Sequence, residues 1–175
     1  MNKHSICIAI VAAASLTAAS AMAGGAGQIN FNGSITDVAC TIVNTPSNPL
    51  DVPLGTYGSN EFKAVGDSTA KKDVKIALSD CPATVTSASV IFDGANDPTN
   101  ADLLALTTEE GVATGIGIQL YDKDQAEVAL HTASKAYALE AGNNTLPFYA
   151  AYKSTAAAVT PGSANGVANF SIIYN

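Results

Sequence analysis

Short runs in which every second residue is hydrophobic recur along this chain and restrict it to a β fold. Residues 72–81, KDVKIALSDC, place Val74, Ile76 and Leu78 two positions apart. This alternation is the side-chain period of a strand with one buried face, whereas a helix repeats every three or four residues. Further β-type runs occupy residues 87–94, 115–122, 134–142 and 144–153, and the remaining segments are rich in turn formers, as in NTPSNPLDVPLG. We therefore predict an all-β sandwich in one domain.

The first 23 residues have the pattern of a cleaved signal peptide and are excluded from the fold. Lys3 supplies a positive charge, residues 6–16 are mostly apolar, and Ala21-Met22-Ala23 is a small-x-small cleavage pattern. The alternative, a membrane anchor, needs about 20 apolar residues, and hydroxyl residues interrupt this run. We predict cleavage between Ala23 and Gly24.

Signal removal leaves two cysteines, Cys40 and Cys81, because Cys7 is lost with the leader. In an exported, oxidising setting the pair predicts one disulfide. It would enclose 81 − 40 − 1 = 40 residues and stabilise the fold by roughly 2 to 4 kcal/mol. A metal site is the competing interpretation, but two cysteines without nearby histidine do not complete a tetrahedral site.

The acidic composition argues against nucleic acid or an anionic membrane as partner. The mature chain has 175 − 23 = 152 residues, 15 acidic and 8 − 1 = 7 basic side chains, and hence a formal charge of 7 − 15 = −8. Binding to polyanions relies on basic patches, and no basic cluster longer than Lys71-Lys72 is present.

The segment 24–33, GGAGQINFNG, reads as an additional strand ahead of the domain. Gly27, Ile29 and Phe31 fall on one face and polar side chains on the other, with a glycine hinge at Gly33. The alternative is a frayed terminus, which has no reason to alternate.

The opposite end of the chain reads as a strand that runs to the last residue. Its alternating apolar positions are Ala168, Phe170, Ile172 and Tyr174, followed by Asn175. Nothing follows to cover this edge. A spare strand at one end and a bare edge at the other explain each other if one molecule's strand fills the gap in the next.

The mature sequence resembles the subunits of chaperone–usher pili, and is most similar to the major shaft subunit of type 1 fimbriae. The resemblance lies in INFNGSITDVAC leading into Cys40, in ALSDC at the second cysteine, in DVPLG and FKAVGD between them, and in LPFYAAYKSTAAAVTPGSANG. The C-terminus also resembles the family's chaperone-recognition pattern, with Gly162 fourteenth from the end and Tyr174 penultimate.

The resemblance implies an incomplete immunoglobulin-like sandwich of six strands, with the seventh supplied in trans. Residues 24–33 would be the donor-strand extension, with Gly27, Ile29 and Phe31 entering a neighbour, and residues 34–175 the pilin domain. The expected partners are neighbouring subunits, a periplasmic chaperone and an outer-membrane usher, and the expected location is the fimbrium at the cell surface. The edge offered to the chaperone would comprise Gly162, Ala168, Phe170, Ile172, Tyr174 and Asn175.

Two further interpretations remain open: a minor adaptor or tip pilin, and a secreted immunoglobulin-like domain that binds a ligand. Catalysis is not expected, because His131 is the only histidine of the mature chain and reads as part of an exposed loop. The acidic residues Asp93, Asp97 and Asp102 lack the Asp-x-Asp-x-Asp-Gly spacing of a calcium loop. We expect no cofactor, metal or small-molecule substrate.

We predict that the mature protein has no free thiol. Thiol labelling after denaturation without reductant should modify neither Cys40 nor Cys81, and labelling after reduction should modify both. Two labelled thiols in the unreduced sample would contradict the disulfide.

Overall fold

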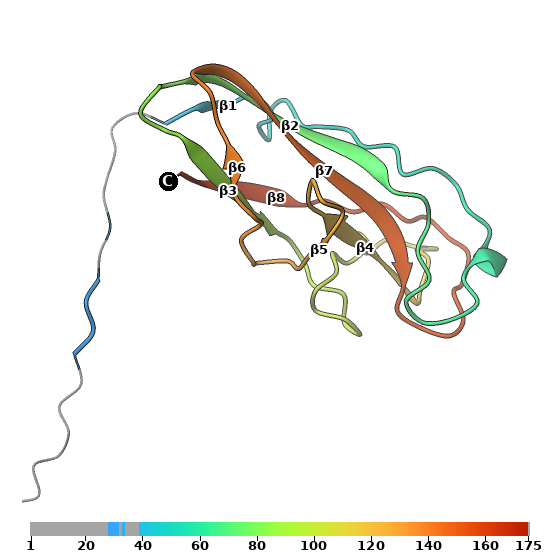
Figure 1. Ribbon diagram of the computed structural model, residues 1–175. Helices are drawn as coiled ribbons and strands as arrows, with labels where there is room; N and C mark the ends of the chain where they lie inside the picture. The colour runs from blue at the N-terminus through green and yellow to red at the C-terminus, as the bar shows by residue number, and fades with distance from the viewer. Residues whose placement is uncertain (1–27, 32, 34–38, 175) are drawn as a thin grey trace, which may run out of the picture. The chain divides into compact units, whose positions relative to one another are not determined.

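The computed structural model describes residues 28–31, 33 and 39–174, which belong to two units, residues 1–35 and 36–175. Among the described residues of the second unit, the regular structure is β-strand (Figure 1) apart from the short 3-10 helix η1, Ser59–Glu61. The described part contains no helix of the length and apolarity required to cross a membrane. The expected signal peptide lies outside the described residues, and the division at Gly33 stays a prediction.

The strands form two sheets, in agreement with the predicted sandwich. The larger sheet has the order β1 (Thr41–Ile42), β2 (Lys72–Cys81), β7 (Gly142–Ser154), β4 (Ile116–Tyr121) and β5 (Glu127–Val128). The smaller sheet has the order β6 (Tyr137–Ala138), β3 (Ser87–Asp93) and β8 (Asn169–Tyr174). All strand pairs are antiparallel.

Eight strands are assigned among the described residues, whereas the sequence predicted six. The two additional strands are β1 and β5, which, like β6, have two residues each. A strand of two residues is too short to show the alternation of hydrophobic and polar residues by which a sequence reveals a strand. The run 134–142 yields only the two-residue β6, while the runs predicted for β2, β3, β4 and β7 are confirmed as strands.

The core lies between the sheets and is centred on Phe148 of β7, which is fully buried. Val74, Ile76 and Leu78 of β2 are buried beside it, so the predicted inward face is confirmed. Phe92 of β3 meets Phe148 edge to face at 5.0 Å between ring centroids. This aromatic contact joins the two sheets, because β3 and β7 belong to different ones.

Tyr137 of β6 places a polar group at the margin of this core. Its ring lies 5.0 Å from that of Phe148. Its hydroxyl donates to the Pro147 carbonyl at 2.8 Å and accepts from the Lys123 amide at 3.0 Å. Burial raises the pKa of Tyr137 to about 12. The phenol therefore stays neutral, and able to donate, throughout the physiological range.

Cys40 and Cys81 form a disulfide, as predicted, with their Cα atoms 4.2 Å apart. The bond connects the residue before β1 to the last residue of β2. Just before Cys81 the register of β2 against β7 shifts, and Asp80 adopts a positive φ of 55°. This bulge lies directly beside the bridged cysteine.

We predict that Phe148→Ala lowers the free energy of unfolding by about 3 to 5 kcal/mol, because it leaves a cavity where the sheets meet. Chemical denaturation followed by far-UV circular dichroism measures the loss. Tyr149→Ala is the matched control, because the adjacent side chain lies on the other face of β7 and is only half-buried. Equal losses in the two variants would contradict the central role of Phe148.

Candidate functional site

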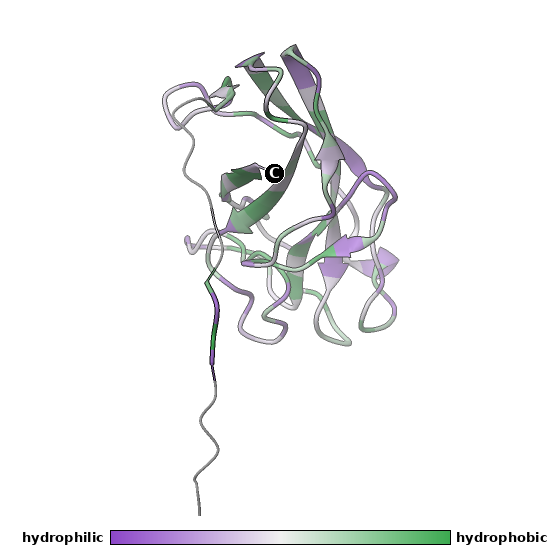
Figure 2. Ribbon diagram, turned by 60° about the vertical axis from the view of Figure 1, so that its left-hand side comes forward, coloured by the Kyte–Doolittle hydropathy of each residue, from purple (hydrophilic) through white to green (hydrophobic). Residues whose placement is uncertain are grey.

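The last strand of the domain, β8, is paired on one side only. Residues 169–174 pair with β3, and no other strand of the described chain pairs with β8. Its Phe170, Ile172 and Tyr174 are half-buried against the core, whereas Ile173 is 43% exposed. Figure 2 shows hydrophobic residues gathered on β3 and β8 next to the C-terminal end. The free edge therefore presents unpaired backbone groups next to apolar side chains.

A groove of about 1200 Å³ opens beside β8. One wall consists of residues 164–170, and the opposite wall of residues between 42 and 56. The floor comes from the inner faces of both sheets. Its apolar residues are Val74, Ile76, Phe92, Leu104, Ile118, Leu120, Ala150 and Tyr152. The groove thus exposes part of the domain's own core.

The wall opposite β8 is the segment 43–56, which was predicted from the sequence to be turn-rich but was not predicted to line a groove. Its start is fixed to β2, because Val43 N donates to the Ala77 carbonyl at 3.0 Å and Asn44 Oδ1 accepts from Ala77 N at 2.8 Å. Val52 and Leu54 then pack on the core. The alternation of Leu50, Val52 and Leu54 was a signal that could have identified this wall.

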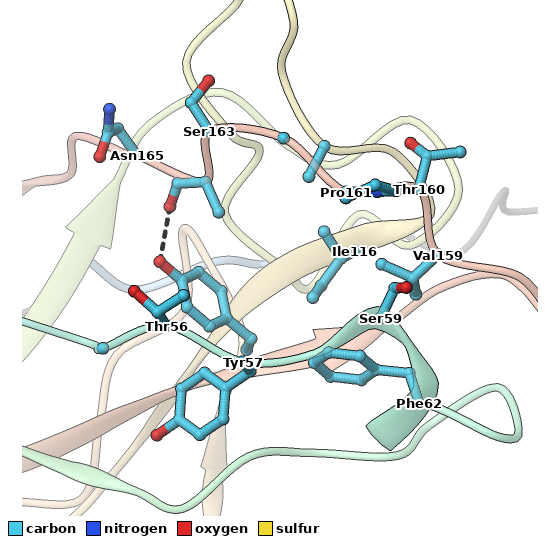
Figure 3. A pocket seen from close by; sticks show the side chains of 15 residues that line it. Thr56, Tyr57, Ser59, Phe62, Ile116, Val159, Thr160, Pro161, Ser163 and Asn165 are labelled. Carbon is cyan, nitrogen blue, oxygen red and sulfur yellow. Dashed lines mark hydrogen bonds between the residues drawn. The ribbon is translucent and has the colours of Figure 1, made fainter.

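A smaller cavity of about 380 Å³ continues the groove at one end. Tyr57, Phe62, Ile116 and Val159 surround it (Figure 3). The Tyr152 hydroxyl donates to the Ala164 carbonyl at 2.8 Å, and burial raises the pKa of this tyrosine. Five residues border both cavities, namely Gly55, Thr56, Tyr152, Ala164 and Asn165. The two cavities therefore form one continuous site.

Gly162 lines the smaller cavity and permits a close backbone approach. A Cβ atom there would lie 2.3 Å from the Gly111 carbonyl oxygen and 2.4 Å from the Ala113 nitrogen. The next residue, Ser163, donates its N–H to the Gly111 carbonyl and accepts from Ala113 N. Only glycine lets these two segments pair at this distance.

Tyr174 links β8 to the disulfide region. Its hydroxyl donates to the Cys40 carbonyl at 3.4 Å, and burial raises the pKa of the phenol. The side chain thus bridges from the edge strand to the residue that precedes β1. The penultimate aromatic therefore has a structural role besides the predicted recognition by a chaperone, which stays a prediction.

The described part of the N-terminal extension, residues 28–31, is exposed throughout, and the donor role of Ile29 and Phe31 stays a prediction. Ile29 is 77% exposed and Phe31 is 91% exposed. The amide of Gln28 donates to Asn30 Oδ1 at 2.7 Å, so the polar positions pair with each other. Gly27, the cleavage site at Ala23 and Gly24, and Asn175 lie outside the described residues.

The other polar candidates serve as loop contacts. His131 follows β5 with a positive φ of 60°, and its Nδ1 lies 3.2 Å from Asp93 Oδ1 and its Nε2 3.1 Å from Asn96 Oδ1. Asp97 Oδ1 accepts from the backbone N–H groups of Thr99 and Asn100. No group of three or more histidine, cysteine, aspartate or glutamate residues in the described ranges could hold a metal ion.

The structure brings Ala168 and Phe170 into the groove wall and Gly162 into the smaller cavity, while Ile172 and Tyr174 continue along β8.

We predict that Gly162→Ala lowers the free energy of unfolding by about 1 to 3 kcal/mol through overpacking. Urea denaturation of the variant and the wild-type protein measures this loss of unfolding free energy. Gly33→Ala is the matched control, because nothing lies within 4 Å of the added carbon. Equal stability of the two variants would contradict the close approach.

Comparison with known proteins identifies the family. Residues 29–175 match the Fimbrial protein family. The type-1 fimbrial protein A chain of Salmonella typhi is 38% identical, covering 98% of this chain and 99% of the relative. A solved Burkholderia pseudomallei antigen and type I fimbria protein is 38% identical, with a TM-score of 0.61 over 83% of this chain and 96% of that one.

A solved chaperone–usher pilus, described in relation to rod uncoiling, is 26% identical, with a TM-score of 0.63 over 86% of this chain and 96% of that one. The shared fold has the two-sheet, nearly all-β architecture described above. The chain belongs to the fimbrial protein family and is a structural subunit of an extracellular pilus.

Proposed function

We propose that this subunit polymerises by donor-strand exchange into the shaft of a chaperone–usher fimbria. Residues 24–32 of one subunit would lie in the groove of the next and pair with the free edge of β8. The observation that carries the proposal is the groove itself, which exposes core side chains beside an unpaired strand edge. This mode of assembly is β-strand addition, in which main-chain hydrogen bonds give affinity and alternate side chains give register.

The dimensions of the extension suit the groove. At about 3.3 Å per residue, nine extended residues span about 30 Å, and the six residues of β8 about 20 Å. The extension, GGAGQINFN, contains no charged side chain. It can therefore enter an apolar groove without the desolvation penalty that a charge would carry.

The energetics favour insertion of the apolar face. Ile29 is 77% exposed and Phe31 is 91% exposed. Burying each in the groove contributes roughly 1.5 to 3 kcal/mol, and each ladder hydrogen bond adds about 0.5 to 1.5 kcal/mol net. The sum is comparable to the whole stability of a small domain.

The empty groove also accounts for the proposed partners. An apolar groove beside a free strand edge favours aggregation, so a periplasmic chaperone would cover it before the usher exchanges the chaperone strand for the next extension. Gly162, Ala168, Phe170, Ile172, Tyr174 and Asn175 would form the edge that the chaperone binds. The proposal divides the chain into a signal peptide (1–23), an extension (24–33) and a pilin domain (34–175). It involves no catalytic step and no cofactor.

The descriptions of the matched relatives support the shaft role over that of a minor adaptor or a secreted binding domain. The Salmonella typhi relative is named as the A chain, and one solved relative is described through its rod. Both are matched over most of their length.

We predict that Phe31→Asp abolishes fibres while leaving a folded, disulfide-bonded subunit that still binds chaperone. An aspartate at this position would be buried unpaired in the neighbour's groove at a cost of several kcal/mol. The subunit is co-expressed with chaperone and usher, and the periplasmic complex and surface fibres are measured separately. Asn30→Asp is the matched control, because it places the same charge on the opposite face of the extension.

The two readouts separate the possible failures. Normal fibres from Phe31→Asp would refute donor-strand exchange. Loss of the chaperone complex would mean that Phe31 belongs to the core of its own domain. Loss of fibres from Asn30→Asp to the same degree would mean that charge anywhere in the extension, rather than burial of one face, prevents assembly.

A further inference from the structure

The groove wall contains a chemically labile pair, Asn165-Gly166. Both residues are exposed, both line the groove, and Asn165 also borders the smaller cavity. Asparagine is among the thermolabile residues, and a following glycine offers the least steric hindrance to attack by its own backbone nitrogen. A second such pair, residues 32 and 33, includes a residue outside the described part and has no role in this inference.

The hydrogen bonds around the pair leave the attacking nitrogen free. The carbonyls before it are held, because Ala113 N donates to Ser163 O at 2.8 Å and Thr107 N donates to Asn165 O at 2.7 Å. Gly166 N–H, in contrast, has no hydrogen-bond partner in the described part of the chain. The Gly166 nitrogen, which is the nucleophile in the cyclisation, is therefore not tied up in a hydrogen bond to a carbonyl.

Packing favours glycine at position 166. A Cβ atom there would lie 2.7 Å from Cδ1 of the buried Ile118 and 3.4 Å from the Ala105 carbonyl oxygen. A larger residue would have to displace Ile118, which forms part of the groove floor. The groove thus keeps a glycine after Asn165 for a structural reason, and the lability follows from it.

We propose that Asn165 is a site of spontaneous deamidation in subunits whose groove is empty. The Gly166 nitrogen attacks Asn165 Cγ, a bond forms between them, and the Cγ–Nδ2 bond breaks. Ammonia leaves with the proton from Gly166 N–H, and a succinimide remains. Water then opens the ring at Cγ to give aspartate, or at the main-chain carbonyl to give isoaspartate. No oxidant or reductant takes part.

The product would weaken one end of the groove. Asn165 Nδ2 donates to Glu109 Oε1 at 3.3 Å, which connects the groove wall to the loop that carries Gly111. Deamidation replaces this donor with a carboxylate that faces the Glu109 carboxylate. Two like charges at this distance repel each other. A deamidated subunit would therefore accept a strand less readily.

A strand in the groove would protect the site, which is the part of the inference that rests on the proposed function. Such a strand would cover Asn165 and bring a carbonyl within reach of Gly166 N–H. Deamidation would then mark subunits that stayed unassembled, and assembled fibres would be spared.

The test compares the full mature Phe31→Asp subunit, purified away from chaperone so that its groove is empty, with wild-type fibres in the same mildly alkaline buffer. Lys153 is the last basic residue, so one tryptic peptide, 154–175, holds both Asn165 and Asn169. Asn169 is the internal control, because it is also exposed but precedes Phe170. Tandem mass spectrometry of this peptide measures conversion at each position over time.

In the Phe31→Asp subunit we expect conversion at Asn165 to be several-fold faster than at Asn169. In fibres we expect conversion at Asn165 to be several-fold slower than in the Phe31→Asp subunit. Equal rates at the two asparagines in the empty subunit would overturn the inference, and so would equal rates at Asn165 in subunit and fibre. If the Phe31→Asp subunit itself forms fibres, the proposed function fails. If it stays unassembled and Asn165 is stable, only this inference fails.

A pair of variants tests the consequence. Asn165→Asp mimics the aspartate product, whereas Asn165→Gln keeps an amide that cyclises far less readily. We expect Asn165→Asp to give several-fold fewer fibres than Asn165→Gln at equal levels of folded subunit. Equal fibre yields would overturn the claim that deamidation impairs assembly.

Discussion

The free edge of β8 above an apolar groove is the constraint on which the rest of this structure depends. β8 is hydrogen-bonded only to β3 among the described strands, so the smaller sheet ends in unpaired backbone groups. The groove floor consists of residues that also form the core, including Ile76 and Phe92. The same side chains form the core and, under the proposed donor-strand exchange, would receive a neighbour's strand, which would complete the core.

Several covalent and steric features fix the groove walls without closing them. The Cys40–Cys81 bond holds the start of one wall to β2. It contributes roughly 2 to 4 kcal/mol in the chain-entropy view. Pro46, Pro49 and Pro53 lie in that wall and have no N–H to donate. The wall is thus a poor partner for β8, which leaves the strand edge available.

The opposite end of the groove depends on close backbone packing. Gly162 approaches the segment 111–113, and Gly166 approaches Ile118. Both contacts require the absence of a Cβ atom, and the second places a glycine directly after Asn165. The chemistry inferred for Asn165 therefore follows from how tightly the wall packs on the floor.

Sequence by itself determined the class of fold, the inward faces of the main strands and the disulfide. Alternation in residues 72–81 and 168–174 is a local property of a half-buried strand, and Cys40 and Cys81 are the two cysteines of the predicted mature chain. The tertiary structure alone decided that residues 43–56 form a groove wall, that β7 lies at the centre of its sheet, and that Asn165 meets Glu109. Each of these depends on residues far apart in the chain, whose pairing is set by how the two sheets pack and leaves no periodic signal in the sequence.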